Sequence, residues 1–235
     1  MAPTIVLITG ANRGIGKGLL EKYLARPNHA VIGTVRDPDH ESSEALASLP
    51  KADGSSLADG LEALKQLEAQ GIDHLDVVIA NAGVCFAWPK VSEIKVEDIE
   101  GHYVPNVHGL IFTYQATLPL LKKSKNGKWI TIGSCSAWLT NQLDMPNAAY
   151  GTSKVVAHWL TKATHREEPE LVAFPIDPGW VQTDLGNNGA HYFGHEQAPL
   201  KVGDVTEGIL KEVDSATRDS HGGKLIQWDG VVLPW

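Results

Sequence analysis

Short, almost continuous apolar runs alternate with longer amphipathic stretches along the whole chain, and this alternation constrains the fold more than any other feature of the sequence. Runs of this kind are typical of parallel strands that helices cover on both faces. Each strand-helix-strand repeat needs a crossover connection, which favours an open, doubly wound α/β sheet. The clear strands are expected at residues 4–10, 29–36, 76–83, 128–134, 171–177 and 224–228.

The stretches between these strands have the length and the amphipathic pattern of helices. A weaker strand at residues 49–53 brings the expected sheet to seven strands, most of them parallel. Because a chain of 235 residues can bury a large core without disulfides or a structural metal, we predict a single domain over residues 1–235. The helices are expected at residues 14–26, 56–70, 96–123, 149–166 and 204–217.

The composition argues against several classes of partner. The 20 basic and 28 acidic side chains give a formal net charge of −8, which disfavours binding to nucleic acid or to anionic membranes. No apolar run approaches about 18 residues and no secretory leader is recognisable, so we predict a cytoplasmic protein without a membrane segment. The two cysteines, Cys85 and Cys135, lack the spacing of metal ligands or of a disulfide framework.

A glycine-rich turn follows the first expected strand and leads into a helix. The segment TGANRGIG at residues 9–16 contains Gly10, Gly14 and Gly16. Glycines permit a tight turn and a close approach of the backbone to a phosphate, and the start of a helix offers free N–H groups. Because the segment lies between a strand and a helix, it predicts a dinucleotide-binding loop, with a plain turn as the alternative.

Three residues separate Gly10 from Gly14, and in this spacing the loop resembles that of the short-chain dehydrogenases/reductases. The match covers nearly the whole chain, with the motifs in the expected order. It implies a Rossmann fold, oxidoreductase activity and cofactor contacts from four segments: the glycine loop, the end of the third strand, an N-A-G element after the fourth, and a P-G element after the sixth. These residues are Gly10, Asn12, Arg13, Gly14, Ile15, Gly16, Asp53, Asn81, Ala82, Gly83, Pro178, Gly179, Val181 and Thr183.

The end of the second strand indicates which nicotinamide cofactor binds. A carboxylate there is typical of NAD, and arginine is typical of NADP, whose 2′-phosphate it contacts. Val35 occupies the expected carboxylate position, and Arg36 follows it. Together with Arg13 it could hold a phosphate by paired hydrogen bonds, so we predict NADP(H). Asp37 leaves NAD(H) open, since a shift of one residue would turn its carboxylate toward the ribose.

Tyr150 and Lys154 are four residues apart and therefore share one face of an expected helix. A nearby ammonium favours the phenolate and would lower the pKa of the tyrosine, which suits general acid-base catalysis. A surface tyrosine above a solvated lysine is the alternative. The family resemblance implies that Tyr150 is the general acid and base, and that Lys154 also contacts the nicotinamide ribose.

The resemblance implies two further catalytic residues. Ser134, at the end of the fifth strand, would orient and polarise the carbonyl, with Ser136 as the alternative. Asn106 resembles the helix asparagine that holds a water for proton relay. Pro105 precedes it, and a proline at this point is expected to kink the helix.

The loops after three strands carry Trp88, Trp138 and Trp180, which would surround a ligand at the carboxyl ends of the strands. We therefore expect a bulky or aromatic ketone. The alternative is that these rings fill loop cores or an oligomer interface. Residues 185–200 are expected to form a mobile lid, whose His191 and His195 have the spacing of metal ligands but are better explained as lid side chains, so no metal is predicted.

The function predicted from these motifs is NADPH-dependent reduction of a ketone to a secondary alcohol, or the reverse reaction. Imine reduction or cyclisation, and a non-catalytic NADP(H)-sensing role, are the alternatives. The Leu-Pro-Trp ending resembles the branch that contains fungal norsolorinic acid ketoreductases and C-factor-like reductases. The family commonly pairs subunits through helices at 96–123 and 149–166, which implies a homodimer or homotetramer.

Overall fold

The computed structural model describes residues 2–59 and 72–235, and its strands form one sheet. The order in the sheet is β3-β2-β1-β4-β5-β6-β7-β8, in which each neighbouring pair is parallel except β7 and β8. This is the doubly wound α/β arrangement that the alternating sequence pattern predicts. The strands are β1 (Thr4–Thr9), β2 (His29–Thr34), β3 (Ser56–Asp59), β4 (Val77–Ala80), β5 (Lys128–Ile132), β6 (Val172–Asp177), β7 (Leu225–Gln227) and β8 (Val232–Leu233).

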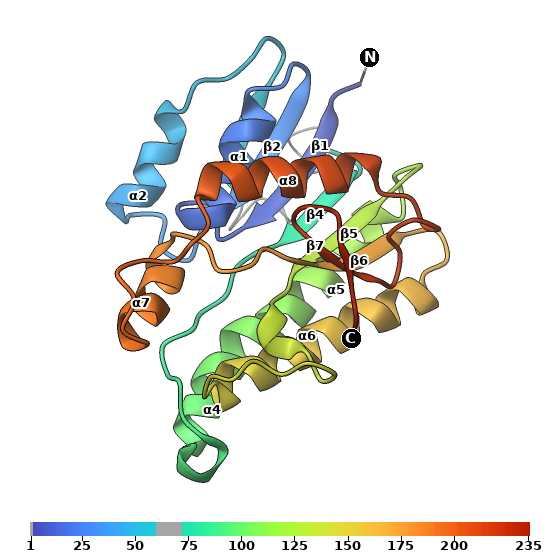
Figure 1. Ribbon diagram of the computed structural model, residues 1–235. Coiled ribbons are helices and arrows are strands. Elements are labelled where there is room, and N and C mark those ends of the chain that lie inside the picture. Colours follow the sequence, from blue (N-terminus) through green and yellow to red (C-terminus); the bar gives the residue numbers. More distant parts are fainter. Residues whose placement is uncertain (1, 60–71) are drawn as a thin grey trace.

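Helices cover both faces of the sheet (Figure 1). The helices α1 and α8 pack together on one face, and the helices α5 and α6 lie on the other face. The longer helices are α1 (Gly14–Leu24), α4 (Val96–Tyr103), α5 (Gly109–Leu121), α6 (Ala148–Glu167), α7 (Asp184–Tyr192) and α8 (Val202–Ser215). The short helical segments are α2 (Glu41–Glu44), η1 (Ala45–Ser48), η2 (Val91–Glu93), η3 (Val104–His108) and η4 (Cys135–Ala137).

Alternate side chains of each central strand feed two separate cores. In β1, Val6 and Ile8 pack toward α1 and α8, whereas Ile5 and Leu7 pack toward α5 and α6. All four are nearly or fully buried, and burying such a side chain contributes about 1.5–3 kcal/mol. The apolar runs are continuous because both faces of each strand need apolar side chains.

The third strand differs from its prediction. Residues 49–53, where a strand was expected, lead instead into a turn at Gly54, and β3 follows it at Ser56–Asp59. This strand is at the sheet edge and has only two apolar residues, Leu57 and Ala58, so its pattern is too short to detect. The helix predicted at 56–70 is therefore wrong at its start, and its remainder lies outside the described residues.

The long helix predicted at 96–123 is interrupted in the middle. The segment η3 is a π-helical turn that joins α4 to α5, and Pro105 stands at its start. Proline lacks the N–H of a regular helical turn and clashes with the preceding turn, which accounts for the interruption. The expected kink is therefore present, and it takes the form of a π-turn that contains Asn106.

Two further features concern the second half of the chain. The tail adds an antiparallel strand, β8, which the sequence pattern did not predict as a separate strand. Residues 185–200, predicted as a lid, consist of most of α7 followed by a loop that returns to the sheet through a bridge between Val181 and Leu200. Within residues 2–59 and 72–235, no helix is both long and apolar enough to cross a membrane.

Candidate active site

The glycine loop between β1 and α1 is shaped by the absence of side chains. Gly10 and Gly14 have φ angles of 65° and 54°, a region that favours glycine. A Cβ on Gly16 would clash with the carbonyl oxygen of Gly10. The loop therefore leaves its backbone bare at the start of α1, where free N–H groups suit a phosphate. This bare cradle fits the diphosphate of a dinucleotide.

The N-A-G segment after β4 fixes the glycine loop from behind. The Asn81 side chain donates to the carbonyl oxygens of Thr9 (2.8 Å) and Gly10 (3.2 Å). In return, the Thr9 hydroxyl accepts the backbone N–H groups of Asn81 and Ala82 at 3.0 and 2.9 Å. Asn81 and Ala82 thus lie beside the loop, and Gly83 lies farther along, between Asn106 and Lys154.

Polar and basic side chains surround the end of β2. Arg36 is exposed, and the described residues offer it no ion pair. Arg13 is also exposed and lies 3.6 Å from Asp184 at the start of α7. Asn12 donates to the Ser42 hydroxyl at 2.8 Å.

Asp37 and Asp53 are placed differently from the basic residues. Asp37 accepts the N–H of Asp39 at 3.2 Å, so its carboxylate stabilises its own turn. Asp53 lies before β3, and its carbonyl accepts the N–H of Asn28, at the edge of the sheet opposite the glycine loop. The position predicted for Asp53, at the carboxyl end of the third strand, is taken by Asp59 because β3 begins later than expected.

The inner face of α6 carries three buried polar residues in successive turns, Tyr150, Lys154 and His158. Lys154 donates to the Ile132 carbonyl oxygen at 2.8 Å, and its Nζ lies 5.6 Å from the centre of the Tyr150 ring. The ammonium therefore lies between the end of β5 and the tyrosine. The alternative of a surface tyrosine above a solvated lysine is wrong, since both side chains are buried.

The Ser134 hydroxyl lies close enough to the Tyr150 phenol to lower the pKa of the phenol, although burial outweighs this effect. Ser134 also accepts the N–H of Ser136 at 3.1 Å, which turns the chain after β5. Ser136 points its hydroxyl elsewhere and accepts a bond from Asn147 at 2.9 Å. The structure therefore pairs Ser134, rather than Ser136, with the tyrosine.

Burial dominates the electrostatics of this cluster. It raises the pKa of Tyr150 above its ordinary value, and it lowers the pKa of Lys154 to about 8. The sequence-based expectation that Lys154 lowers the pKa of Tyr150 is not what this structure gives, because desolvation of the phenol outweighs the other influences on it. Tyr150 is consequently a protonated acid at neutral pH.

Asn106 uses its side chain to hold neighbouring segments together. Its amide accepts the N–H of Val84 at 2.8 Å and donates to the Val84 carbonyl and to the Ser153 hydroxyl, both at 3.0 Å. The π-turn that contains Asn106 is thereby tied to the loop after β4 and to α6. Asn106 lies beside the buried polar cluster of α6, with its side-chain amide occupied by protein partners.

The P-G segment after β6 lies against the glycine loop. Gly179 donates its N–H to Asp177 at 3.0 Å, and Val181 is buried. Thr183 accepts the N–H of Gly186 at 3.0 Å at the start of α7. Its methyl group lies 3.1 Å from where a Cβ on Gly14 would be. The loops after β1, β4, β5 and β6 thus meet at the carboxyl edge of the sheet, as open α/β sheets require for a ligand site.

Comparison with known proteins agrees with this geometry. A family model described as short chain dehydrogenase matches residues 4–191. The chain belongs to the short-chain dehydrogenases. It is therefore an oxidoreductase that acts on carbonyl or alcohol groups, and the predicted family, fold and enzyme class are confirmed.

Members of this short-chain dehydrogenase family resemble the chain over its whole length. A norsolorinic acid ketoreductase of Dothistroma septosporum is 38% identical, over 99% of this chain and 92% of the relative. A norsolorinic acid ketoreductase of Aspergillus parasiticus is also 38% identical, over 99% and 91%. The NADPH-bound carbonyl reductase from chicken fatty liver superposes with a TM-score of 0.86 at 26% identity, covering 100% of both chains.

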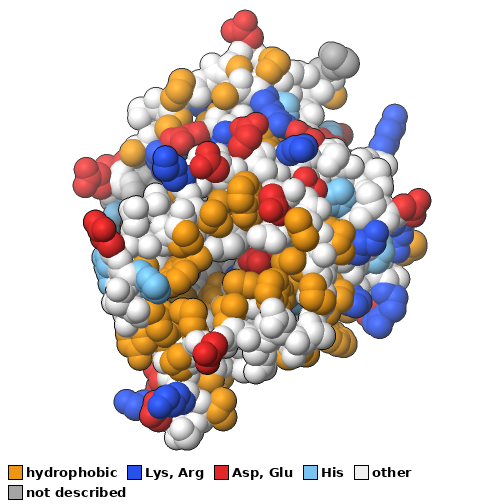
Figure 2. Space-filling model, viewed as in Figure 1, with side chains coloured by type: hydrophobic (Ala, Val, Ile, Leu, Met, Phe, Trp, Pro, Cys, Tyr) orange, Lys and Arg blue, Asp and Glu red, His pale blue; other side chains and the backbone are white. Residues whose placement is uncertain are grey.

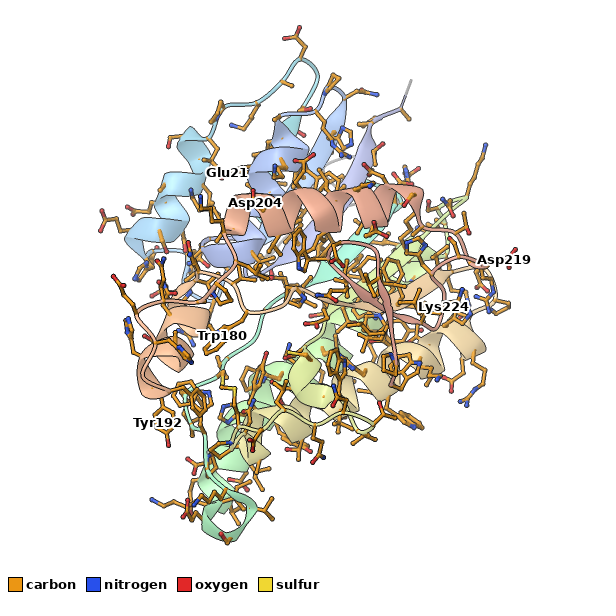
Figure 3. The ribbon with its side chains drawn as sticks, viewed as in Figure 1. Glu21, Trp180, Tyr192, Asp204, Asp219 and Lys224 are labelled. Carbon is orange, nitrogen blue, oxygen red and sulfur yellow. The ribbon has the colours of Figure 1, made fainter. Side chains whose placement is uncertain are left out.

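Two of the three tryptophans near this short-chain dehydrogenase site contact α7. Trp88 stacks on Tyr192 of α7, with ring centres 4.8 Å apart, and Trp180 donates to the Gly186 carbonyl at 2.8 Å. In Figure 3, both Trp180 and Tyr192 lie near α7. These rings pack within the protein, which favours the alternative that they fill loop cores. Trp138 has a buried Nε1 with no hydrogen-bond partner among the described residues.

The lid histidines contact protein groups. His191 Nε2 bonds to the Glu196 carbonyl at 2.8 Å, and the His195 ring packs edge-on against Trp180. Among residues 2–59 and 72–235, no three His, Cys, Asp or Glu side chains gather as a metal site would require.

Sequence reasoning missed two buried histidines in this region, His102 with its ring centre 6.2 Å from that of Tyr150, and His158 near Lys154. His102 Nε2 accepts the N–H of Phe86 at 3.3 Å, and His158 Nε2 accepts the N–H of Ser134 at 3.2 Å. The spacing of His158, eight residues after Tyr150, was a signal that could have found it. Cys85 and Cys135 also lie near the phenol, and burial raises the pKa of each thiol to about 12, so both remain protonated.

Proposed function

We propose that the protein is an NADPH-dependent reductase of a bulky ketone, with the reverse oxidation available. The observation that carries this proposal is the cluster of Ser134, Tyr150 and Lys154 beside a bare glycine loop. A non-catalytic sensor has no chemical need for a buried, protonated phenol in contact with a serine hydroxyl.

The residues of the cluster have distinct tasks in this proposal. When bound, the reduced nicotinamide supplies the hydride for the carbonyl carbon. Tyr150, kept protonated by burial, donates its proton to the carbonyl oxygen. Ser134 donates a hydrogen bond to the same oxygen and so fixes its position. Lys154, held by the Ile132 carbonyl, faces the N-A-G loop and contacts the ribose of the cofactor.

NADP(H) is supported as the cofactor by the end of β2. Arg36 lacks an acidic partner among the described residues, and Arg13 has one only at 3.6 Å. The competing carboxylate of Asp37 is engaged by its own turn. Two available guanidiniums favour a 2′-phosphate over a ribose hydroxyl. The similar carbonyl reductase from chicken fatty liver holds NADPH, which points the same way.

The substrate class is supported by the apolar surroundings of the site. Phe86, Leu139 and Tyr192 follow the carboxyl ends of β4, β5 and β6 and are 52%, 66% and 59% exposed. Figure 2 shows hydrophobic side chains gathered around a hollow on this face. Exposed apolar side chains at a ligand site favour a large, flat, apolar molecule. The names of two similar relatives, norsolorinic acid ketoreductases, agree with a polycyclic aromatic ketone.

Oligomeric state and location follow as secondary proposals. Phe112 of α5 and Trp159 of α6 are 67% and 63% exposed, which supports pairing of two subunits through these helices in a homodimer or homotetramer. A cytoplasmic location is consistent with two free thiols, and one sheet built from both ends of the chain supports a single domain.

Cofactor turnover with a set of ketones tests the proposal. The purified protein is mixed with NADPH or NADH, and loss of absorbance of the reduced cofactor is followed with polycyclic aryl ketones and with small aliphatic ketones. We expect NADPH and the polycyclic ketones to give the highest kcat/KM. Higher efficiency with small aliphatic ketones would contradict the substrate class, and no reduction of any carbonyl would contradict the function.

A further inference from the structure

The backbone N–H of Ser134 donates its hydrogen bond to a side chain. At the end of β5, Gly133 still donates its N–H to Ile176 in the neighbouring strand at 2.8 Å. The next N–H, that of Ser134, instead donates to Nε2 of His158 on α6 at 3.2 Å. A buried N–H without a partner is costly, so this bond determines how the chain leaves the strand.

The bond defines the protonation state of His158. Because Nε2 accepts, the ring proton is on Nδ1 and the imidazole is neutral. The side chain is 4% exposed, and burial together with the nearby Lys154 ammonium lowers its pKa to about 3. The acceptor is consequently present throughout the neutral range of pH.

The His158 ring is closely packed on two sides. A Cβ on Gly133 would clash with Nε2, so glycine leaves the ring its place at the end of β5. On another side, the Trp235 ring lies edge-on, with ring centres 5.9 Å apart. Trp235 is itself held by the Thr140 hydroxyl, which donates to its carbonyl at 3.0 Å, and by the Lys162 ammonium 4.3 Å above its ring.

We propose that His158 is a positioning residue that fixes Ser134 against Tyr150 by accepting the Ser134 N–H, with Trp235 as its support. Tyr150, Lys154 and His158 occupy successive turns of one helix, so the helix that carries the acid also carries the anchor of the serine. The distance between the phenol and the serine hydroxyl is thereby set by a single rigid element and one hydrogen bond. The hydrogen bond between Ser134 and His158 does not depend on the proposed function. Only its expected effect on kcat rests on that function.

Three substitutions separate the loss of the acceptor from the loss of the ring. His158→Phe keeps an aromatic ring and removes the acceptor. His158→Gln can place its amide oxygen near the position of Nε2, whereas His158→Asn has a shorter side chain that does not reach it. Arg166→Ala, at an exposed position near the end of the same helix, is the matched control.

We expect kcat of the Phe and Asn variants to fall by about 10–100-fold, as for a small misplacement of a reacting group. The Gln variant should retain most of the activity, and the KM of the ketone and the Kd of NADPH should change little in all three. In a Ser134→Ala background, His158→Phe should add little further loss, because its effect passes through Ser134. Equal kcat for the Gln and Asn variants, or full additivity with Ser134→Ala, would overturn the proposal.

Hydrogen exchange of the Ser134 amide gives a readout that needs no substrate. Its protection should drop in His158→Phe and be retained in His158→Gln and in Arg166→Ala. If the wild-type protein reduces no ketone but this pattern holds, the proposed function fails and the positioning contact stands. Unchanged protection in His158→Phe contradicts the contact whatever the activity, and should that variant not fold, the Gln and Asn pair decides.

Discussion

The two halves of the candidate site are built in different ways. The glycine loop is a local structure, in which three glycines among eight consecutive residues leave the backbone bare at the start of α1. The proposed catalytic cluster is assembled from distant segments, since Ser134 follows β5, whereas Tyr150 and Lys154 come from α6. One half depends on bare backbone and the other on buried polar side chains.

This difference has consequences for energetics. The structure of a cradle of backbone atoms is disturbed by any added side-chain atom. It does not change with pH, because backbone amides do not titrate. A buried polar cluster is sensitive to substitution for a different reason. Each buried polar group needs a hydrogen-bond partner, and burial shifts the pKa of each titratable group. The following predictions, from the largest effect to the smallest, use substitutions and pH to separate the two halves.

Tyr150→Phe should have the largest effect and be confined to the catalytic half. It removes the phenol proton while retaining the ring, so we expect kcat to fall by about 10³-fold. The Kd of NADPH, measured by fluorescence of the reduced cofactor, should stay within about twofold. Substantial remaining activity would mean that another group supplies the proton.

Gly16→Ala should damage the cofactor half. The added Cβ meets the Gly10 carbonyl oxygen, so the loop must shift, which should cost about 3 kcal/mol of folding stability. Binding of NADPH should weaken with it. Gly203→Ala is the control, because a Cβ there meets no atom within 4 Å. The free energy of unfolding of both variants, from urea titration, checks this, and equal values would contradict a tight cradle.

Acid should destabilise the catalytic half through His158. Its pKa of about 3 in the folded protein lies below the ordinary 6.5, so below pH 6.5 the unfolded chain binds a proton that the folded protein does not. Stability is therefore complete above pH 6.5 and is lost as the pH falls, by about 2 kcal/mol between pH 7 and 5. Urea unfolding at both values should show this loss in the wild type and a loss smaller by that amount in His158→Gln. Equal losses would show that the buried ring does not resist protonation.

Arg36→Ala should have the smallest effect and should depend on the cofactor. Loss of a charge-assisted contact to the 2′-phosphate is expected to weaken NADP⁺ binding by about tenfold and to leave NAD⁺ binding unchanged. Calorimetric Kd values for both cofactors measure this, with the exposed Arg166→Ala as control. An equal effect on both cofactors would place Arg36 away from the phosphate.

The sequence predicted what is local and periodic. Continuous apolar runs predicted the parallel strands, and the glycine spacing with its strand and helix predicted the cradle. The i, i+4 spacing of Tyr150 and Lys154 predicted their common face, because one helix sets it. The roles given to these residues came from family resemblance, and they stay predictions until they are measured.

The rest depends on partners far apart in the chain. His158 is 24 residues from Ser134, and no local pattern indicates that a backbone N–H at the end of β5 lacks a strand partner. The edge strand β3 has too few apolar residues to be distinguished from a turn. The sequence pattern therefore places Asp53 at the end of the third strand, a position that Asp59 occupies in the structure. The direction in which the pKa of Tyr150 shifts could be found only from the structure, because burial of its phenol depends on the packing of α4, α6 and the loop after β4.

The π-turn at Pro105 has a consequence for ligand binding. Because proline cannot complete a regular helical turn, the irregular backbone around Asn106 is imposed by covalent geometry and needs no bound ligand. The loss of conformational entropy for this segment therefore occurs during folding. A ligand that arrives later meets a preorganised wall, and more of its intrinsic interaction energy remains available as affinity.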